Sequence, residues 1–272
     1  MPAPTEITVS QLSRLIGTPS APLLIDLRID PDFDEEPLIL PTARRHSHLD
    51  ITSLAERVGD QHVVVYCQKG RKISQGSVAL LRSHGVNAES LAGGHFAWRD
   101  EGKMLVPEAK LPPRAADGHT LWVTRHRPKI DRMACPWLIR RFIDPDARFL
   151  FVSPGEILAV AEKFSATPFD IEDVFWSHRG DRCTFDTMLD EFALSDPALG
   201  RLATIVRGAD TNQLALAPQS SGLLAVSLGL SRMYRDDNAQ IDAGMLLYDA
   251  LFRWARDASD ETHDWPQPEG RR

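Results

Sequence analysis

One cysteine stands where a buried strand, a basic loop and a helix are expected to meet. Residues 63–66, VVVY, form an apolar run typical of a buried strand, and Cys67 follows directly. The next five residues include one glycine and the basic side chains of Lys69, Arg71 and Lys72, and a helix is expected just after them. Loop N–H groups, the positive end of a helix and nearby cations all favour a thiolate over a thiol. Cys67 is therefore a candidate nucleophile.

The alternative is that Cys67 only fills space, because free cysteine is among the most buried residue types. Three basic residues around Gly70 argue against this interpretation, since a loop that merely closes a core gains nothing from them. We interpret the loop as an anion site whose backbone N–H groups would stabilise an anionic sulfur.

This loop resembles the active-site loop of the rhodanese sulfurtransferases. In that family a cysteine opens a six-residue loop with glycine fourth and a basic residue sixth, positions held here by Cys67, Gly70 and Lys72. Two further motifs also resemble the family: LIDLR at residues 24–28, and LAGG followed by AW within residues 91–98. The resemblance covers residues 5–105 and depends on all three motifs together.

The resemblance implies a sulfurtransferase that needs no cofactor for sulfur transfer. Cys67 would attack the outer sulfur of thiosulfate or of a persulfide donor, carry it as a persulfide and pass it to a thiol acceptor. Asp26 and Arg28 are expected to brace the loop rather than react. The substrate-binding residues would be those of the loop itself, Gln68, Lys69, Gly70, Arg71 and Lys72.

Two departures from the family pattern bear on the substrate. Gln68 and Lys72 stand where rhodaneses commonly carry arginine. A related phosphatase branch has a longer loop, with histidine before the cysteine and a final arginine that grips phosphate through two hydrogen bonds. Here Tyr66 precedes Cys67 and the loop ends in lysine, so sulfur chemistry is favoured over phosphate chemistry.

Strands expected at residues 23–27, 63–66 and 88–91 alternate with helices, which predicts an α/β domain with a parallel sheet covered by helices. The acidic stretch 30–36 is expected to be a solvated loop. VPEAKLPPRAADG contains three prolines and predicts a linker. We expect four segments: a rhodanese-like domain over residues 1–105, a linker over 106–118, a mainly helical α/β second domain over 119–257 and a flexible tail over 258–272.

Composition limits the partners and the compartment. The chain of 272 residues is 43% hydrophobic and 25% charged, which is ordinary for a globular protein. A net charge of −7 argues against broad binding to nucleic acids or membrane surfaces. Three cysteines form no disulfide framework, and neither a signal peptide nor a membrane span is recognisable. We therefore expect a cytoplasmic protein.

The second domain opens with a concentration of basic residues. Between residues 125 and 148 seven basic residues, among them Arg125 and Arg132, stand against three acidic ones, among them Asp131. Cys135 precedes a proline, so it is expected to cap a helix over residues 137–143 and to be activated there. Arg125, Asp131, Arg132 and Cys135 are the candidate site residues of this stretch.

SHRGDRCTFD brings nitrogen, sulfur and carboxylate ligands close together in sequence. His178 and Cys183 could hold a transition metal, with Asp181 and Asp186 nearby, although the spacing matches no established signature. The alternative is a buried cysteine and a hydrogen-bonded surface histidine.

Several segments of residues 119–257 resemble the C-terminal domain of the chromate-resistance proteins, the ChrB-like family. They are found at residues 122–125, 129–144, 178–186, 206–210 and 229–234. The resemblance implies a link to chromate resistance and, in some members, to chromate-responsive regulation.

These expectations favour a cytoplasmic two-domain sulfurtransferase linked to chromate or oxyanion resistance, in which Cys135 or Cys183 could accept sulfur or reduce chromate. One rival is a sensor that binds chromate, another oxyanion or a metal through Arg125, Arg132, His178 and Cys183. A third interpretation is a catalytically silent rhodanese module used for docking.

Overall fold

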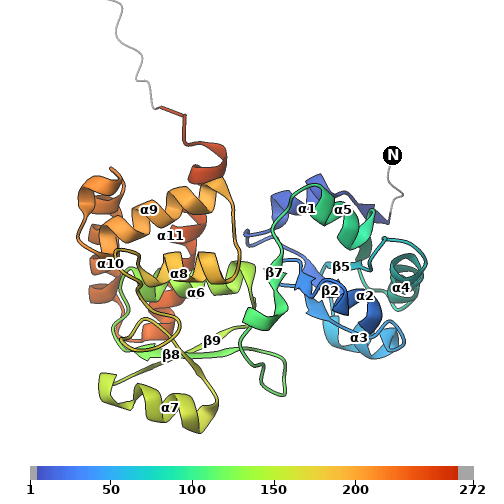
Figure 1. Cartoon of the computed structure of the whole chain (residues 1–272), viewed down its shortest axis with the longest axis horizontal. Coiled ribbons are helices and arrows are strands. Elements are labelled where there is room, and N and C mark those ends of the chain that lie inside the picture. Colours follow the sequence, from blue (N-terminus) through green and yellow to red (C-terminus); the bar gives the residue numbers. More distant parts are fainter. Residues whose placement is uncertain (1–4, 263–272) are drawn as a thin grey trace, which may run out of the picture.

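The computed structural model describes residues 5–262. Its N-terminal half is built on a five-stranded parallel sheet in the order β1-β6-β5-β2-β4, as Figure 1 shows in part. Continuous apolar runs such as VVVY form these strands because both faces of the sheet are covered. The strands are β1 (Glu6–Ile7), β2 (Leu23–Asp26), β4 (Arg44–Arg45), β5 (Val63–Tyr66) and β6 (Ala88–Leu91).

Alternate residues of each strand face opposite sides of the sheet. Leu24 and Val64 belong to one hydrophobic cluster, whereas Ile25 and Val65 belong to another. The first cluster includes side chains of α1 (Val9–Leu15) and α5 (Gly94–Asp100), and the second includes side chains of α3 (Ile51–Val58) and α4 (Lys72–Ser83). The sheet is thus covered by helices on both faces, as the sequence predicts.

The second half combines a small parallel sheet with a group of helices. Its strands β8 (Leu121–Arg125), β9 (Arg148–Val152) and β10 (Thr167–Pro168) lie in the order β10-β8-β9. Val123 packs with Ile157 of α7 (Ile157–Phe164), while Trp122 joins the larger core. The remaining helices are α6 (Asp131–Phe142), α8 (Thr184–Glu191), α9 (Pro197–Asp210), α10 (Ser220–Met233) and α11 (Asp237–Asp257).

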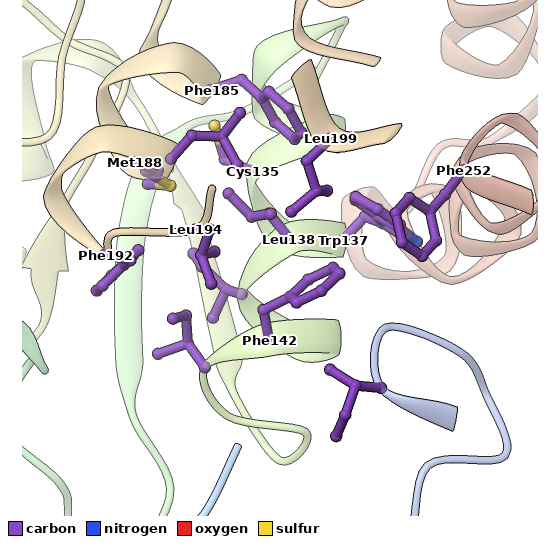
Figure 2. Packing of buried hydrophobic residues seen from close by; sticks show 14 of the residues in the cluster. Cys135, Trp137, Leu138, Phe142, Phe185, Met188, Phe192, Leu194, Leu199 and Phe252 are labelled. Atoms are coloured by element: carbon purple, nitrogen blue, oxygen red, sulfur yellow. The ribbon is translucent and has the colours of Figure 1, made fainter. Parts of the chain in front are cut away.

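Trp137 of α6 lies at the centre of this helical group (Figure 2). Its ring centroid lies 5.6 Å from that of Phe252 and 5.8 Å from that of Phe142, and its Nε1–H donates to Asp249 at 2.8 Å. The buried aromatic rings and the satisfied indole explain why the helices pack around this residue. The α/β class and the mainly helical second half are confirmed.

The two halves share one hydrophobic core and several polar contacts. Leu12 of α1 lies in the same cluster as Phe142 and Phe252. The N–H of Thr42 donates to the carbonyl of Phe142 at 2.9 Å, and Arg44 pairs with Asp144 and Asp146 at 2.7 Å each. These contacts fix the two halves against one another, so the halves are not independent domains joined by a flexible linker.

The expected linker is partly structured. β7 (Val106–Pro107) pairs antiparallel with β3 (Leu38–Ile39), and a short 3-10 helix, η1 (Glu108–Lys110), follows. Lys110 reaches Glu191 of the second half with its ammonium group 2.6 Å from the carboxylate. Residues 263–272 of the expected flexible tail lie outside the described residues.

Two expectations of local structure are wrong. Residues Asp30–Asp34 form a short helix, α2, because Pro31 suits a first turn and Phe33 is buried as an anchor. Helix α6 begins at Asp131 rather than at residue 137, so Pro136 lies inside it. Burial of Met133 and Ala134 stabilises the additional turn and outweighs the loss of one backbone hydrogen bond at the proline.

Within residues 5–262, no helix is both long enough and apolar enough to cross a bilayer.

Gly17, just after α1, tests the packing between the halves. It has a φ of +77°, and a methyl group there would lie 2.9 Å from Phe142 Cε1 and 3.0 Å from Phe252 Cε1. Gly17→Ala should lower the free energy of unfolding by about 2–4 kcal/mol, because overpacking adds to the backbone cost. Gly85→Ala is the control, since its φ is +83° but no atom lies within 4 Å of the added methyl group. Equal losses in urea unfolding would contradict close packing at Gly17.

Candidate active site at Cys67

Cys67 lies at the carboxyl end of the central strand β5, and the loop after it leads into α4. The residue is 5% exposed, so most of it is covered by its neighbours. Carboxyl ends of parallel strands are the usual place for a site in an open α/β sheet. The structure therefore places the expected nucleophile where the topology makes it accessible to a ligand.

The surroundings of Cys67 favour its thiolate. Burial alone raises the pKa of the thiol, but the hydroxyl of Ser74 and the backbone N–H groups of Ser74, Arg71 and Lys69 outweigh burial and lower the pKa below its ordinary value. The sequence predicts this direction from the loop amides and the helix N-terminus. The N–H of Ser74 belongs to the first turn of α4, where backbone donors lack helical acceptors.

Sequence reasoning missed Ser74 as a site residue. Its side chain is fully buried, and within residues 5–262 its Oγ has no hydrogen-bond partner apart from the Cys67 sulfur on which it acts. A buried hydroxyl without an acceptor is costly, and an anionic sulfur at Cys67 is the acceptor to which its proton can turn. The only signal in the sequence is the position, seven residues after Cys67, at which a helix first turn presents its side chain toward the loop.

Gly70, Gly93 and Gly94 allow the loop after Cys67 to lie directly on the start of α5. Gly70 and Gly94 both have positive φ, and a side chain at Gly70 would lie 2.6 Å from the nitrogen of Gly94. The N–H groups of His95 and Phe96 donate to the carbonyls of Cys67 and Gln68 at 3.0 Å each. The first turn of α5 therefore binds two carbonyls of the loop, while the N–H groups of Lys69 and Arg71 act on the sulfur.

The basic residues of the loop remain available for a ligand. Lys69, Arg71 and Lys72 are exposed, and none of them forms an ion pair with another residue in the described part of the chain. Gln68 lies 3.3 Å from the carboxylate of Glu35. Three unpaired cations beside an anion-stabilising loop would attract an anionic substrate.

Asp26 and Arg28 form a fully buried ion pair with a shortest distance of 2.5 Å. Arg28 also donates to the carbonyls of Glu36 and Leu38 at 3.0 and 2.6 Å. The pair thus fixes the segment after α2, and it supports the carboxyl end of β2 beside Tyr66 of β5. Its action on the Cys67 loop is indirect, through that strand pair.

A second group of charged residues lies in the C-terminal half, and we name Asp131, Asp170, His178 and Asp210 the His178 cluster. His178 Nε2 lies 3.1 Å from Asp210, 3.4 Å from Asp131 and 3.5 Å from Asp170. Hydrogen bonds to these carboxylates, first of all to Asp131, raise the pKa of His178 well above its ordinary value, and burial raises the pKa of Asp131. Asp170 and Asp210 were not predicted as site residues, because they are distant in sequence.

An unusual backbone conformation places Asp131 in this cluster. Ile130, the residue before α6, has a φ of +37°, which is strained for a β-branched side chain. Its N–H donates to Ser227 Oγ at 3.1 Å, and its carbonyl accepts from the hydroxyl of Tyr248 at 3.0 Å. Strained backbone of this kind persists only where the surroundings hold it, and it is frequent at functional sites.

The expected positive patch is largely neutralised. Arg125 and Arg132 both pair with Asp170, at 3.4 and 3.2 Å. Three more of the seven basic residues pair with carboxylates, Arg140 with Asp242, Arg141 with Asp249 and Arg148 with Asp117. The sequence shows the basic residues together but does not show the acidic residues that the fold brings to them.

One expectation about the other cysteines is wrong. Cys135 lies inside α6 and is fully buried, and this burial raises the pKa of its thiol well above the ordinary value, so it is not activated. Cys183 is the N-cap of α8, where its sulfur accepts from the N–H of Asp186. Burial raises the pKa of Cys183 too. Among the described residues, the ligand atoms that lie together come from Asp131, Asp170 and His178 and do not include the sulfur of Cys183, and both thiols are buried.

Ser74→Ala should raise the pKa of Cys67, because the thiolate loses the hydroxyl that lowers this pKa. The rate of alkylation by iodoacetamide against pH reports the thiolate fraction, and the buried Cys135 and Cys183 should react far more slowly. Ser77→Ala, which removes another buried serine hydroxyl of α4, is the control and should leave the alkylation profile unchanged. An unchanged profile in Ser74→Ala would show that the hydroxyl does not act on the sulfur.

Comparison with known proteins gives relatives for both halves. Protein ChrB of Cupriavidus metallidurans (strain ATCC 43123 / DSM 2839 / NBRC 102507 / CH34) is 35% identical over 217 residues. These residues are 75% of this chain and 65% of the length of that protein, so the chain spans slightly less than two thirds of this curated relative.

Similar solved structures each cover about a third of the chain. A protein from Staphylococcus saprophyticus subsp. saprophyticus is 28% identical, with 36% of this chain and 95% of that chain covered and a TM-score of 0.32. A rhodanese-like domain protein from Staphylococcus aureus is 25% identical, with 36% and 94% covered and a TM-score of 0.32.

Two domain families match the chain, and each match contains one of the two sites described above. The rhodanese-like domain family matches residues 8–101, which contain Cys67 and its loop. The ChrB C-terminal domain family matches residues 122–255, which contain the His178 cluster. The chain therefore joins a rhodanese-like domain to a ChrB C-terminal domain.

Proposed function

We propose that the chain is a thiosulfate-type sulfurtransferase that moves sulfane sulfur through a persulfide on Cys67, in the service of resistance to chromate or another oxyanion. One observation carries the proposal. The pKa of Cys67 is lowered by the Ser74 hydroxyl and loop N–H groups despite burial, at the end of the central strand of a rhodanese-like domain. A silent docking module would need neither the lowered pKa nor the unpaired cations beside it.

In the first step the Cys67 thiolate attacks the outer sulfur of thiosulfate. A bond forms between Cys67 Sγ and that sulfur as the sulfur–sulfur bond of the donor breaks, and sulfite leaves with the electron pair. Lys69, Arg71 and Lys72 attract the dianionic donor, and the loop N–H groups hold the negative charge that remains on the persulfide. A low-molecular-weight persulfide would react in the same way, with its thiolate as the leaving group.

In the second step an acceptor thiolate attacks the outer sulfur of the persulfide. The acceptor becomes a persulfide, and Cys67 leaves as the thiolate that began the cycle, so no cofactor is required. Cys135 and Cys183 are both buried at 0% exposure. The acceptor thiol therefore comes from another molecule.

The link to chromate rests on the relatives. The C-terminal half belongs to the ChrB C-terminal domain, and Protein ChrB is 35% identical to this chain. We place the chain in the cytoplasm, because its three cysteines are free and a reducing compartment keeps thiols in that state. The prediction that nucleic acids and membranes are not partners follows from the net charge of −7.

A second candidate function is sensing by the C-terminal half. The His178 cluster favours it, because charged groups that are buried together and strongly perturbed are frequent at binding sites. The rhodanese-like half would then report or respond to a ligand bound in the other half through the shared core.

Cys67→Ser should abolish sulfite release from thiosulfate, because a serine hydroxyl cannot replace the thiolate as the attacking group. The measurement is steady-state sulfite production with a thiol acceptor such as dithiothreitol. Cys183→Ala is the control that removes a buried thiol elsewhere and should retain turnover. Turnover that persists in Cys67→Ser at the wild-type rate would contradict the proposed nucleophile.

A further inference from the structure

We propose that Asp131, Asp170 and His178, with Asp210 beside them, form a binding site for a divalent transition-metal ion. One ligand atom from each of the first three residues lies within 4.8 Å of the others. Asp210 adds a third carboxylate oxygen, 3.1 Å from His178 Nε2. These spacings let an ion touch several of the side chains after small rotations, with bonds of about 2.0–2.2 Å.

An unpartnered atom in the cluster points independently to a ligand. Asp131 is fully buried, and within residues 5–262 its Oδ1 has no nitrogen or oxygen hydrogen-bond partner, although the buried thiol of Cys183 lies beside this carboxylate. Its Oδ2 already accepts from the N–H of Thr184 at 2.5 Å. A buried carboxylate oxygen without a partner costs free energy, so unsatisfied groups of this kind call for a specific explanation. A cation bound in the cluster would satisfy this oxygen.

The charges of the cluster also favour a cation. Three carboxylates converge on one imidazole nitrogen, while Arg125 and Arg132 both reach the same one of them, Asp170. In the part of the chain that the structure describes, Asp131 and Asp210 have no arginine partner, and both carboxylates contact Nε2 of His178. A metal ion would take the place of the Nε2 proton: the lone pair of Nε2 binds the ion, and the proton passes to solvent.

The fold holds two of the four residues on helices and leaves the cluster a path to solvent. Asp131 is the first residue of α6, and Asp210 is the last residue of α9. The hydroxyl of Thr184 donates to Asp170 at 2.9 Å and orients that carboxylate. His178 has a side chain 40% exposed, and that of Asp210 is 19% exposed, so an ion can enter from this side and keep water ligands there.

The donor set selects the class of metal. Carboxylate oxygens suit manganese, and imidazole suits iron and zinc, so a site of several oxygens and one nitrogen fits Mn²⁺ or Fe²⁺ best. Among the described residues, the ligand atoms that lie together come from Asp131, Asp170 and His178 and not from Cys183, so the group itself offers no thiolate, the ligand that soft ions prefer. The site does not depend on sulfur transfer at Cys67.

Titration of the full-length, EDTA-treated protein with Mn²⁺ tests the proposal, with the free ion followed by electron paramagnetic resonance. We expect one bound ion per chain. Asp170→Asn and His178→Ala should each weaken binding at least tenfold, because each removes a ligand. Asp242→Asn and His126→Ala, which change exposed residues outside the cluster, are matched controls and should bind as the wild type does.

One further variant and a choice between the ligand variants complete the test. Cys67→Ser should bind Mn²⁺ unchanged, which separates this site from the sulfur-transfer site. If Asp170→Asn does not fold, His178→Ala decides, because its side chain is partly exposed and contributes little to the core. Failure of the wild type to bind Mn²⁺, Fe²⁺ or Zn²⁺, or binding that is the same in His178→Ala, would overturn the proposal.

Discussion

The contact between Gly70 and the Gly93–Gly94 pair is the constraint on which the Cys67 site depends. Because no side chain stands between the two segments, the loop after β5 lies directly on the start of α5. The N–H groups of His95 and Phe96 donate to the carbonyls of Cys67 and Gln68. With the carbonyls held there, the remaining N–H groups face the sulfur and lower the pKa of Cys67. A side chain at Gly70 would separate these segments and disperse the donors.

The shared core gives the chain a second constraint. α1 belongs to the rhodanese-like half in sequence, yet its Leu12 lies in one cluster with Phe142 of α6 and Phe252 of α11. α6 also begins at Asp131, a member of the His178 cluster. Helix α6 therefore both packs against the first half and carries a residue of the His178 cluster. A ligand that moved Asp131 would act on the same element against which the first half packs.

Much of the fold could be predicted from the sequence. Val63–Tyr66 is recognisable as a buried strand, and the alternation of strands and helices gives a parallel sheet with Cys67 at a strand end. The direction of the pKa shift at Cys67 follows from local sequence as well, because the loop amides and the helix N-terminus are neighbours along the chain. Local signals fail where tertiary packing decides. Pro136 indicates a helix start, but α6 begins five residues earlier, at Asp131, because Met133 and Ala134 are buried there.

The sites assembled from distant residues could not be found in this way. Asp170 and Asp210 reach His178 only through the fold, and Asp170 also pairs with two arginines that look unpaired in sequence. Ser74 was missed for a different reason: a serine in a helix first turn is common, and only its burial beside Cys67 makes it significant.

Intact-protein mass spectrometry after incubation with thiosulfate and removal of the excess tests persulfide formation most directly. If Cys67 carries sulfane sulfur, the wild-type chain gains the mass of one sulfur atom, a thiol added afterwards removes it, and Cys67→Ser gains nothing. A wild-type chain of unchanged mass, or an equal gain in Cys67→Ser, would contradict a Cys67 persulfide and would leave the rhodanese-like half as a docking module.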